Sequence, residues 1–404
     1  MGDSVRPVAV SRRTAVAGLL TAALTASPHA VAAPGTRRAA DGLEPLRVGV
    51  LLDTSGRGRV QGARQLLGVR HQAQMVNAAA GDLVELLVRD TRGRTAETRS
   101  LARHLVETDR VDALLGTSAP ATAAVVGEIG QAAGVPVVMP AAGGRATQPY
   151  VFRSGAPIAL TTTRMLQAIA QAGLRRVAAF STESNSPPQA WDEMRQEMAG
   201  LGLELVDHKE FVPPADNLEA GLKPLIEAGP DVLAVFTTPP YNGIVARDAR
   251  ALGWSGPMYF SPAAGHPGFA ETAGPAATGA RVIAPWLLAH QQAPATLPNG
   301  YAVRAFAKSF EAAGHGPVGT YVGYGADALS LLHQAFYGHR DRVRARTELE
   351  NMTHVGTTGV YRMSPDDHSG LDADALTVVE WRDGGWKPFT TASRQEGRSQ
   401  ARRP

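Results

Sequence analysis

Short β-type runs alternate with helical patterns along most of this chain, from residue 46 to residue 285. The run at 46–52 (LRVGVLL) comes first, and apolar residues then recur at helical spacing over 62–79. Because parallel strands need a crossover of a dozen or more residues, usually a helix, this order indicates βαβ units and parallel sheets. We therefore predict an α/β fold with two doubly wound parallel-sheet lobes.

The alternation falls into two successive units, followed by helices and two further β-type runs. The first unit is predicted to have strands at 46–52, 83–88, 111–115 and 137–139 and helices at 62–79, 96–106 and 121–133. After a crossover at 150–153 and a helix at 161–172, the second has strands at 176–180, 203–211, 232–236, 258–261 and 281–285 and helices at 189–201, 218–228 and 242–252. Helices at 301–313, 320–336 and 342–352 and β-type runs at 359–363 and 376–381 close the pattern. Two such units predict a ligand cleft at the carboxyl ends of the strands.

The first 33 residues have the pattern of an export signal. Arg12 and Arg13 precede an apolar run at 15–26, which is too short to span a bilayer, and 30–32 (AVA) is a small-residue cleavage pattern. The paired arginines favour a twin-arginine signal, and a general secretory signal is the alternative. We expect a linker over 34–44, a disordered tail over 391–404, and a soluble mature protein that is secreted or periplasmic.

Charge and cysteine content exclude several classes of protein. The net charge is +3, but three arginines and one aspartate lie in 1–33, and four arginines and one glutamate lie in 391–404. The body between them is therefore slightly acidic, which argues against a nucleic-acid partner, because phosphate contacts need clustered Lys and Arg. The chain has no cysteine, so thiolate metal sites, a Cys nucleophile and a lipid anchor on cysteine are excluded.

A series of short motifs gives the chain a family resemblance. They are 48–56 (VGVLLDTSG), 112–116 (DALLG), 134–140 (GVPVVMP), 324–328 (YGADA), 356–360 (GTTGV) and 384–386 (GGW). In this order the chain resembles the type I periplasmic binding proteins of the leucine/isoleucine/valine group. The resemblance implies two lobes joined by three crossovers, with lobe one at 45–152 and 284–350 and lobe two at 155–280 and 355–390.

The same resemblance implies a function. Members of this group bind a small solute, often an amino acid, between the lobes and pass it to an ABC permease in the membrane. It implies no catalysis and no cofactor, and we expect a monomer.

Two loops of the first lobe are the predicted ligand contacts. The first contains Ser118, Ala121 and Thr122 at the start of a helix, where free backbone N–H groups and the helix dipole favour a carboxylate. The alternative for Ser118 and Thr122 is a helix cap. The second loop offers the backbone of Ala142 and Gly143, with glycine where the resemblance implies a hydroxyl residue.

Three further positions are candidates. Ser55 follows the first strand and offers a hydroxyl, while Asn185 and Tyr241 lie in strand-to-helix loops of the second lobe. Tyr241 as an ordinary loop residue is the alternative, and Glu183 is more simply an exposed carboxylate than an ammonium partner. The family's aromatic residue before the helix-one glycine is replaced by Gln61.

Other classes of function fit less well. Gly56, Gly58 and Gly62 follow a strand, and Asp90 ends the next one, as in a nucleotide-dependent exported oxidoreductase, but the glycine spacing departs from G-x-G-x-x-G. No G-x-S-x-G elbow and no H-E-x-x-H pair occurs, and 366–368 (DDH) is predicted to be a solvated loop rather than a metal site. A ligand-binding sensor component remains an alternative to transport.

Overall fold

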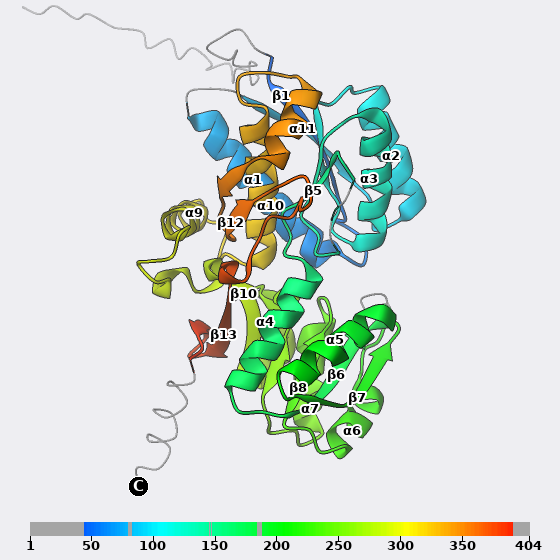
Figure 1. Ribbon diagram of the computed structural model, residues 1–404, viewed down its shortest axis with the longest axis vertical. Helices are drawn as coiled ribbons and strands as arrows, with labels where there is room; N and C mark the ends of the chain where they lie inside the picture. The colour runs from blue at the N-terminus through cyan, green and yellow to red at the C-terminus, as the bar shows by residue number, and fades with distance from the viewer. Residues whose placement is uncertain (1–43, 80–82, 145, 147, 184–187, 391–404) are drawn as a thin grey trace, which may run out of the picture. The chain divides into compact units, whose positions relative to one another are not determined.

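The computed structural model describes residues 44–79, 83–144, 146, 148–183 and 188–390. The predicted signal and most of the linker, the tail at 391–404 and the candidate Asn185 lie outside this range. Within it, the predicted alternation of strands and helices is confirmed (Figure 1). No described helix combines the length and the apolar character that crossing a membrane requires.

The first sheet has five parallel strands in the order β2-β1-β3-β4-β5. They are β1 (Leu46–Leu52), β2 (Val84–Asp90), β3 (Ala113–Gly116), β4 (Val137–Met139) and β5 (Val151–Arg153). The helices between them are α1 (Arg59–Ala78), α2 (Thr95–Glu107) and α3 (Pro120–Ala133). Residues 150–153 were predicted to be only a crossover, but they contain β5, the edge strand beside β4.

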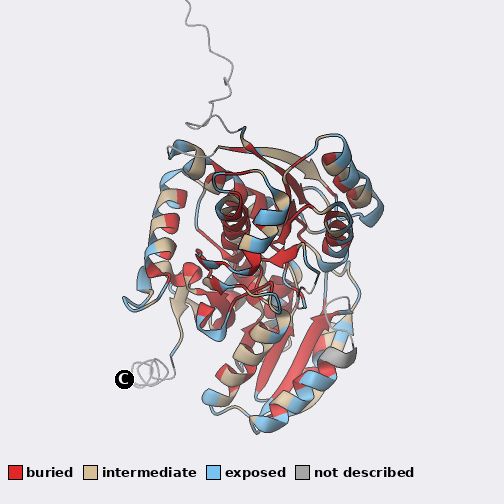
Figure 2. Ribbon diagram, turned by 45° about the horizontal axis from the view of Figure 1, so that its top comes forward, coloured by how far each residue is buried: buried red, intermediate tan, exposed pale blue. Residues whose placement is uncertain are grey.

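Both faces of this sheet are covered by helices, so its strands are apolar on both sides. Leu114 packs in a cluster with residues of α2 and α3, while the next residue, Leu115, packs in the cluster that contains α1 residues. Alternate side chains of a strand point to opposite faces, which explains the near-continuous apolar runs in the sequence. Figure 2 shows the strands as buried and the outer faces of the helices as exposed.

The second sheet has seven strands in the order β14-β13-β10-β9-β8-β6-β7. They are β6 (Arg176–Thr182), β7 (Glu204–Phe211), β8 (Val232–Phe236), β9 (Met258–Phe260), β10 (Ala280–Pro285), β13 (Leu376–Arg382) and β14 (Gly385–Pro388). Helices α4 (Ile158–Gln171), α5 (Pro188–Gly200), α6 (Glu219–Glu227), α7 (Tyr241–Ala251) and α8 (Gly268–Ala273) accompany it. The strands β13 and β14 are antiparallel to their neighbours, so this sheet is mixed rather than wholly parallel.

The helices after β10 return to the first lobe. They are α9 (Gly300–Ala312), α10 (Thr320–Ala335) and α11 (Arg342–Glu350). In Figure 1, α10 lies beside α1, although more than 200 residues separate them. A Cβ at Gly68 of α1 would lie 2.0 Å from the Val322 carbonyl oxygen, and one at Gly325 would lie 2.2 Å from that of Gln65. Glycine at these positions is what allows the two helices to pack so closely.

A small hairpin, β11 (Thr353–Val355) and β12 (Val360–Arg362), packs against α10. The buried carboxylate of Asp327 accepts hydrogen bonds from the backbone N–H groups of Thr357 and Thr358 and from the hydroxyls of Thr358 and Tyr361, at 2.6–3.1 Å. The lobe boundaries stay a prediction, and these contacts favour assigning 353–371 to lobe one rather than dividing the lobes at 355.

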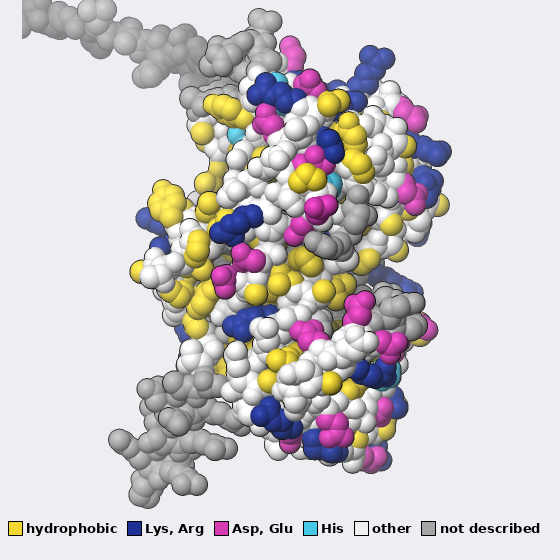
Figure 3. All heavy atoms as spheres, viewed as in Figure 1, with side chains coloured by type: hydrophobic (Ala, Val, Ile, Leu, Met, Phe, Trp, Pro, Cys, Tyr) yellow, Lys and Arg dark blue, Asp and Glu magenta, His cyan; other side chains and the backbone are white. Residues whose placement is uncertain are grey.

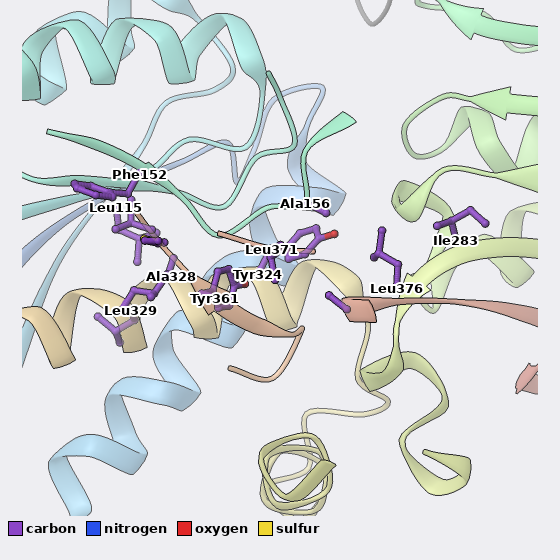
Figure 4. Packing of buried hydrophobic residues seen from close by; sticks show 14 of the residues in the cluster. Leu115, Phe152, Ala156, Ile283, Tyr324, Ala328, Leu329, Tyr361, Leu371 and Leu376 are labelled. Atoms are coloured by element: carbon purple, nitrogen blue, oxygen red, sulfur yellow. The ribbon is translucent and has the colours of Figure 1, made fainter. Parts of the chain in front are cut away.

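An apolar core runs without a break through the crossovers. Figure 4 shows Leu115 and Phe152 at one end, Ile283 and Leu376 at the other, and Tyr324 and Leu371 between them. Burial of this apolar surface stabilises the connection between the two sheets, at about 25 cal/mol per Å² removed from water. The crossover at Ser154 is also hydrogen bonded, since its Oγ donates to the Tyr324 carbonyl at 2.8 Å.

Candidate functional site

The first predicted ligand loop joins β3 to α3. Ala119 occupies the cap position of α3, and no described side chain caps the helix there. The Thr122 hydroxyl is buried, 2.7 Å from the Thr117 hydroxyl and 3.1 Å from the Ala119 carbonyl oxygen. Thr122 is therefore not a helix cap, and no side chain of the described residues caps the positive end of the helix dipole.

Ser118 and Ala121 differ in their exposure. Ser118 is buried, and its Oγ accepts a hydrogen bond from the Asp53 backbone N–H at 3.4 Å, so it is not a cap either. Ala121 is exposed in the first turn of α3. Of the three contacts predicted in this loop, Ala121 is thus the exposed one, and Ser118 and Thr122 are buried.

Two glutamines of α1 donate hydrogen bonds to the two predicted ligand loops. Gln61 Nε2 donates to the Ser118 carbonyl at 2.5 Å, and Gln65 Nε2 donates to the Pro140 carbonyl at 3.0 Å. Residues four apart lie on the same face of a helix, so one face of α1 fastens both loops. The sequence analysis noted Gln61 only as a departure from the family pattern. The signal that could have identified its role is its position near the start of the first helix, directly before Gly62.

The second loop packs over a buried arginine. Ala142 is exposed and Gly143 is buried. Arg153 Nη1, from the end of β5, donates to the Ala141 carbonyl at 2.7 Å. A Cβ at Gly143 would lie 2.7–2.9 Å from three atoms of this guanidinium. Glycine at 143 therefore makes room for Arg153, which the sequence analysis did not identify, whereas Gly144 faces open space.

Ser55 is exposed, and it is engaged by a carboxylate. Its Oγ donates to Asp90 at 2.5 Å, and the Thr54 backbone N–H donates to the same carboxylate at 2.9 Å. Burial alone raises the pKa of Asp90, but these hydrogen bonds and one from the Arg92 backbone N–H lower it to about 2. A ligand contact by the Ser55 hydroxyl would therefore compete with Asp90.

The glycine loop after β1 is closed by Asp53. Its carboxylate accepts hydrogen bonds from the N–H groups of Gly56 and Gly58 at 2.6 and 2.7 Å. A dinucleotide pyrophosphate needs such N–H groups itself, and a carboxylate in their place repels it. This geometry argues against the oxidoreductase alternative.

In the second lobe, Tyr241 begins α7 at the carboxyl end of β8. Its ring packs edge-on against Phe211 with centroids 5.1 Å apart, and Phe211 stacks on Phe180. Thr237, also after β8, is buried, and its hydroxyl has no hydrogen-bond partner among the described residues. The sequence analysis did not name Thr237 as a candidate. The signal that could have identified it is a polar residue directly after a buried strand. Glu183 is exposed, as expected.

The two lobes meet through backbone carbonyls of the second lobe. Arg57 Nη1 donates to the Pro213 carbonyl at 3.3 Å, and the Tyr321 hydroxyl donates to the Ala263 carbonyl at 3.2 Å. The Thr320 backbone N–H, at the start of α10, donates to the Gly265 carbonyl at 2.8 Å. These bonds lie where the loops of the second sheet approach the first lobe.

Within the DDH loop, Asp366 is exposed as predicted, but His368 is not. His368 is buried, its ring stacks on Phe152 at 4.4 Å, and its Nδ1 lies 2.9 Å from the Val151 carbonyl oxygen. Its Nε2 lies 3.4 Å from the buried Glu350 carboxylate. The ring thus joins the C-terminal segment to β5. The described residues contain no group of three side chains suited to a metal.

Comparison with known families decides the identity of this fold. The family model described as periplasmic binding protein matches residues 45–386. The chain belongs to the periplasmic binding protein family. This is a family of extracytoplasmic solute-binding proteins rather than enzymes, as the sequence resemblance implied. The comparison with curated proteins found no match to the chain.

Solved structures of periplasmic binding proteins share the fold at low identity. A leucine-binding protein from Thermotoga maritima is 19% identical with a TM-score of 0.72, over 85% of this chain and 98% of that one. A branched-chain amino acid binding protein from Streptococcus pneumoniae, in complex with isoleucine, is 18% identical with a TM-score of 0.73, over 86% and 99%. An ABC transporter solute-binding protein from Rhodopseudomonas palustris, in complex with benzoate, is 21% identical with a TM-score of 0.72, over 86% and 96%.

Proposed function

We propose that this periplasmic binding protein captures a small polar solute, an amino acid or a close relative, between its lobes and delivers it to an ABC importer. The observation that carries the proposal is the uncapped start of α3 beside the Ala142 loop. Because Gln61 and Gln65 fix both loops, the backbone donors are held in place before a ligand arrives. Preorganised donors of this kind lower the entropic cost of binding.

The contacts proposed for the ligand follow the two lobes. The ligand carboxylate accepts hydrogen bonds from the backbone around Ser118, Ala121 and Thr122 and from Ala142 and Gly143. Tyr241 of the second lobe covers the remainder of the ligand. The structural relatives support a small carboxylate-bearing solute in this fold, since one is in complex with isoleucine and another with benzoate.

Export and delivery belong to the same proposal. The signal pattern at 1–33 sends the chain across the cytoplasmic membrane, and cleavage after the small residues at 30–32 releases the mature protein, which acts as a monomer. A binding protein must also release its ligand to a permease, so a Kd of about 1 μM, or about −8 kcal/mol, is expected.

A thermal-shift screen of amino acids, amides, short peptides and aromatic acids tests the proposal. A ligand at about 100 times its Kd adds about 2.7 kcal/mol to the stability of the fold, which raises Tm measurably. Each hit is then compared with its carboxamide. Equal stabilisation by the amide would show that the start of α3 does not bind a carboxylate, and the absence of any hit would reject solute capture.

A further inference from the structure

Arg153 carries a positive charge at the ligand loop that no described residue balances. Its side chain is only 9% exposed, and its Nε has no hydrogen-bond partner among the described residues. Among the described residues, the Ala141 carbonyl is the one acceptor bonded to it, and no carboxylate pairs with it. Burial lowers the pKa of Arg153 to about 10, so the group remains protonated at neutral pH.

The position of this charge is set by Gly143. The guanidinium lies directly against the Gly143 Cα, within 3 Å of where a Cβ would stand. Ala142, the exposed residue of the loop, is between Ala141, which accepts from Arg153, and Gly143, which covers it. The charge is therefore next to the backbone that we propose binds the ligand.

The acidic groups at the same strand ends are already engaged. Asp53 accepts from Gly56 and Gly58, and Asp90 accepts from Ser55 and Thr54. In the second lobe, Glu210 accepts from Ser181 Oγ at 3.1 Å and from Trp191 Nε1 at 3.0 Å, and Glu183 is exposed to solvent. None of them offsets the charge of Arg153 in the first lobe.

A second guanidinium adds to the positive potential where the lobes meet. Arg64 lies one turn beyond Gln61 on α1, and its Nη2 donates to the Pro317 carbonyl at 2.5 Å. Its Nε also has no partner among the described residues. A region with excess positive charge between low-dielectric walls attracts anions and raises their local concentration.

A purely structural role does not account for a charged group at position 153. A neutral donor would satisfy the Ala141 carbonyl equally well, whereas a buried, unpaired cation destabilises the fold. A charge retained at a cost in stability is typical of a functional site. We propose that Arg153 makes the cleft select ligands of net negative charge, that is, organic acid anions or acidic amino acids in preference to neutral zwitterions. This inference rests on the proposed function and narrows its ligand class.

A charge series on matched carbon skeletons tests the selection. Calorimetric titration of glutarate, glutamate and glutamine, and of 4-methyl-2-oxopentanoate and leucine, compares anions with neutral zwitterions of similar size. The anions should bind at least about 10-fold tighter than their neutral counterparts, as expected for a hydrogen bond or contact to a charged group. If the general screen identifies another solute, the affinity of its carboxylate form is compared with the affinity of its amide.

Variants assign the selection to Arg153. R153M should remove the preference for the anion, while R153K should keep it, and the Tm of ligand-free R153M should be unchanged or raised. The matched control is R250M, because Arg250, although only half-buried, bonds among the described residues to the carbonyls of Trp254 and Gly256 and also has a pKa lowered by burial. R153Q, which retains a donor for Ala141, replaces R153M if the latter does not fold.

Two results would overturn the inference while leaving solute capture intact. One is a neutral zwitterion that binds as tightly as its matched anion. The other is an R153M protein that keeps the preference for the anion but has a lower Tm without ligand, which is the behaviour of a structural residue.

Discussion

Gln61 Nε2 donates a hydrogen bond to the Ser118 carbonyl oxygen, and this bond joins helix α1 to the loop that precedes α3. The sequence positions are 57 residues apart, so only the parallel order β1 beside β3 brings them together. Gln65, one turn later, does the same for the loop after β4. The two predicted ligand loops therefore share one support, and weakening that support should affect both.

Replacing Gln61 by alanine should weaken ligand binding by about 10-fold and lower the stability of the ligand-free protein by only about 1 kcal/mol. The Ser118 carbonyl loses its donor, so the loop is less ordered before binding and loses conformational entropy when the ligand binds. Titration of the screening hit and chemical denaturation measure the two effects. Q74A, at an exposed position of the same helix, is the control; an unchanged affinity in Q61A would refute the role of the support.

Thr122→Val should destabilise the ligand-free protein by about 1–2 kcal/mol. The variant keeps the shape of the side chain but removes a buried hydroxyl that lies within hydrogen-bond distance of Thr117 Oγ1 and the Ala119 carbonyl. Urea denaturation measures the loss. A lower ligand affinity with unchanged stability would instead show that the hydroxyl contacts the ligand directly.

Acid should destabilise the protein through His266. Burial, with a smaller contribution from the charge of Arg64, lowers the pKa of His266 to about 4, whereas the unfolded value is near 6.5. Between these values the unfolded chain binds a proton that the folded chain does not, so stability decreases as pH falls through this window. The contribution of this group is on the order of 2–3 kcal/mol.

Denaturation at pH 7 and pH 4.5 measures this effect by comparison of variants. H266Q should lose less stability on acidification than the natural protein, while H104Q, at an exposed position, should behave like the natural protein. The same acid sensitivity in H266Q would assign the effect to other buried histidines such as His354, whose pKa is also lowered, chiefly by burial.

Ligand binding should close the two lobes about their crossovers. The crossovers are joined by apolar packing and by hydrogen bonds such as that from the Ser154 hydroxyl to the Tyr324 carbonyl at 2.8 Å, which hold the connection while the lobes rotate. Small-angle scattering should show a smaller radius of gyration with ligand than without it. Tight binding with an unchanged scattering profile would contradict closure.

Export should remove the N-terminus near residue 32. Intact-mass analysis of the secreted protein should give a species that begins shortly after the small residues at 30–32. Changing Arg12 and Arg13 to lysine should block export by the twin-arginine route. Normal export of that variant would identify the general secretory route, and a secreted protein that retains Met1 would reject cleavage.

The sequence predicted the elements well wherever periodicity is strong. The helices of the first unit were expected at 62–79, 96–106 and 121–133, and they are Arg59–Ala78, Thr95–Glu107 and Pro120–Ala133. Strand β5 was predicted only as a crossover, and its pairing with β4 is what makes these three residues a strand. The second sheet became mixed because β13 returns from the crossover antiparallel to β10.

The candidate site was predicted less completely. The two loops predicted from the family resemblance follow β3 and β4, which are parallel neighbours, so both lie at the same edge of the first sheet; that they bind a ligand stays a prediction. His368 was expected in solvent, yet it is buried against Phe152, since a loop far along the chain covers β5. On the face drawn in Figure 3, basic and acidic side chains are interspersed, an arrangement that the net charge alone does not determine.

By itself, the sequence determined the α/β class, the order of strands and helices and the family, because these depend on local periodicity and on short motifs in series. The tertiary structure decided which side chains support the site. Gln61, Gln65 and Arg153 gain their roles from backbone carbonyls of other segments, at Ser118, Pro140 and Ala141. Every residue has a backbone carbonyl, so the residue type does not show which carbonyl will accept a hydrogen bond. Such partners are known only from the folded chain.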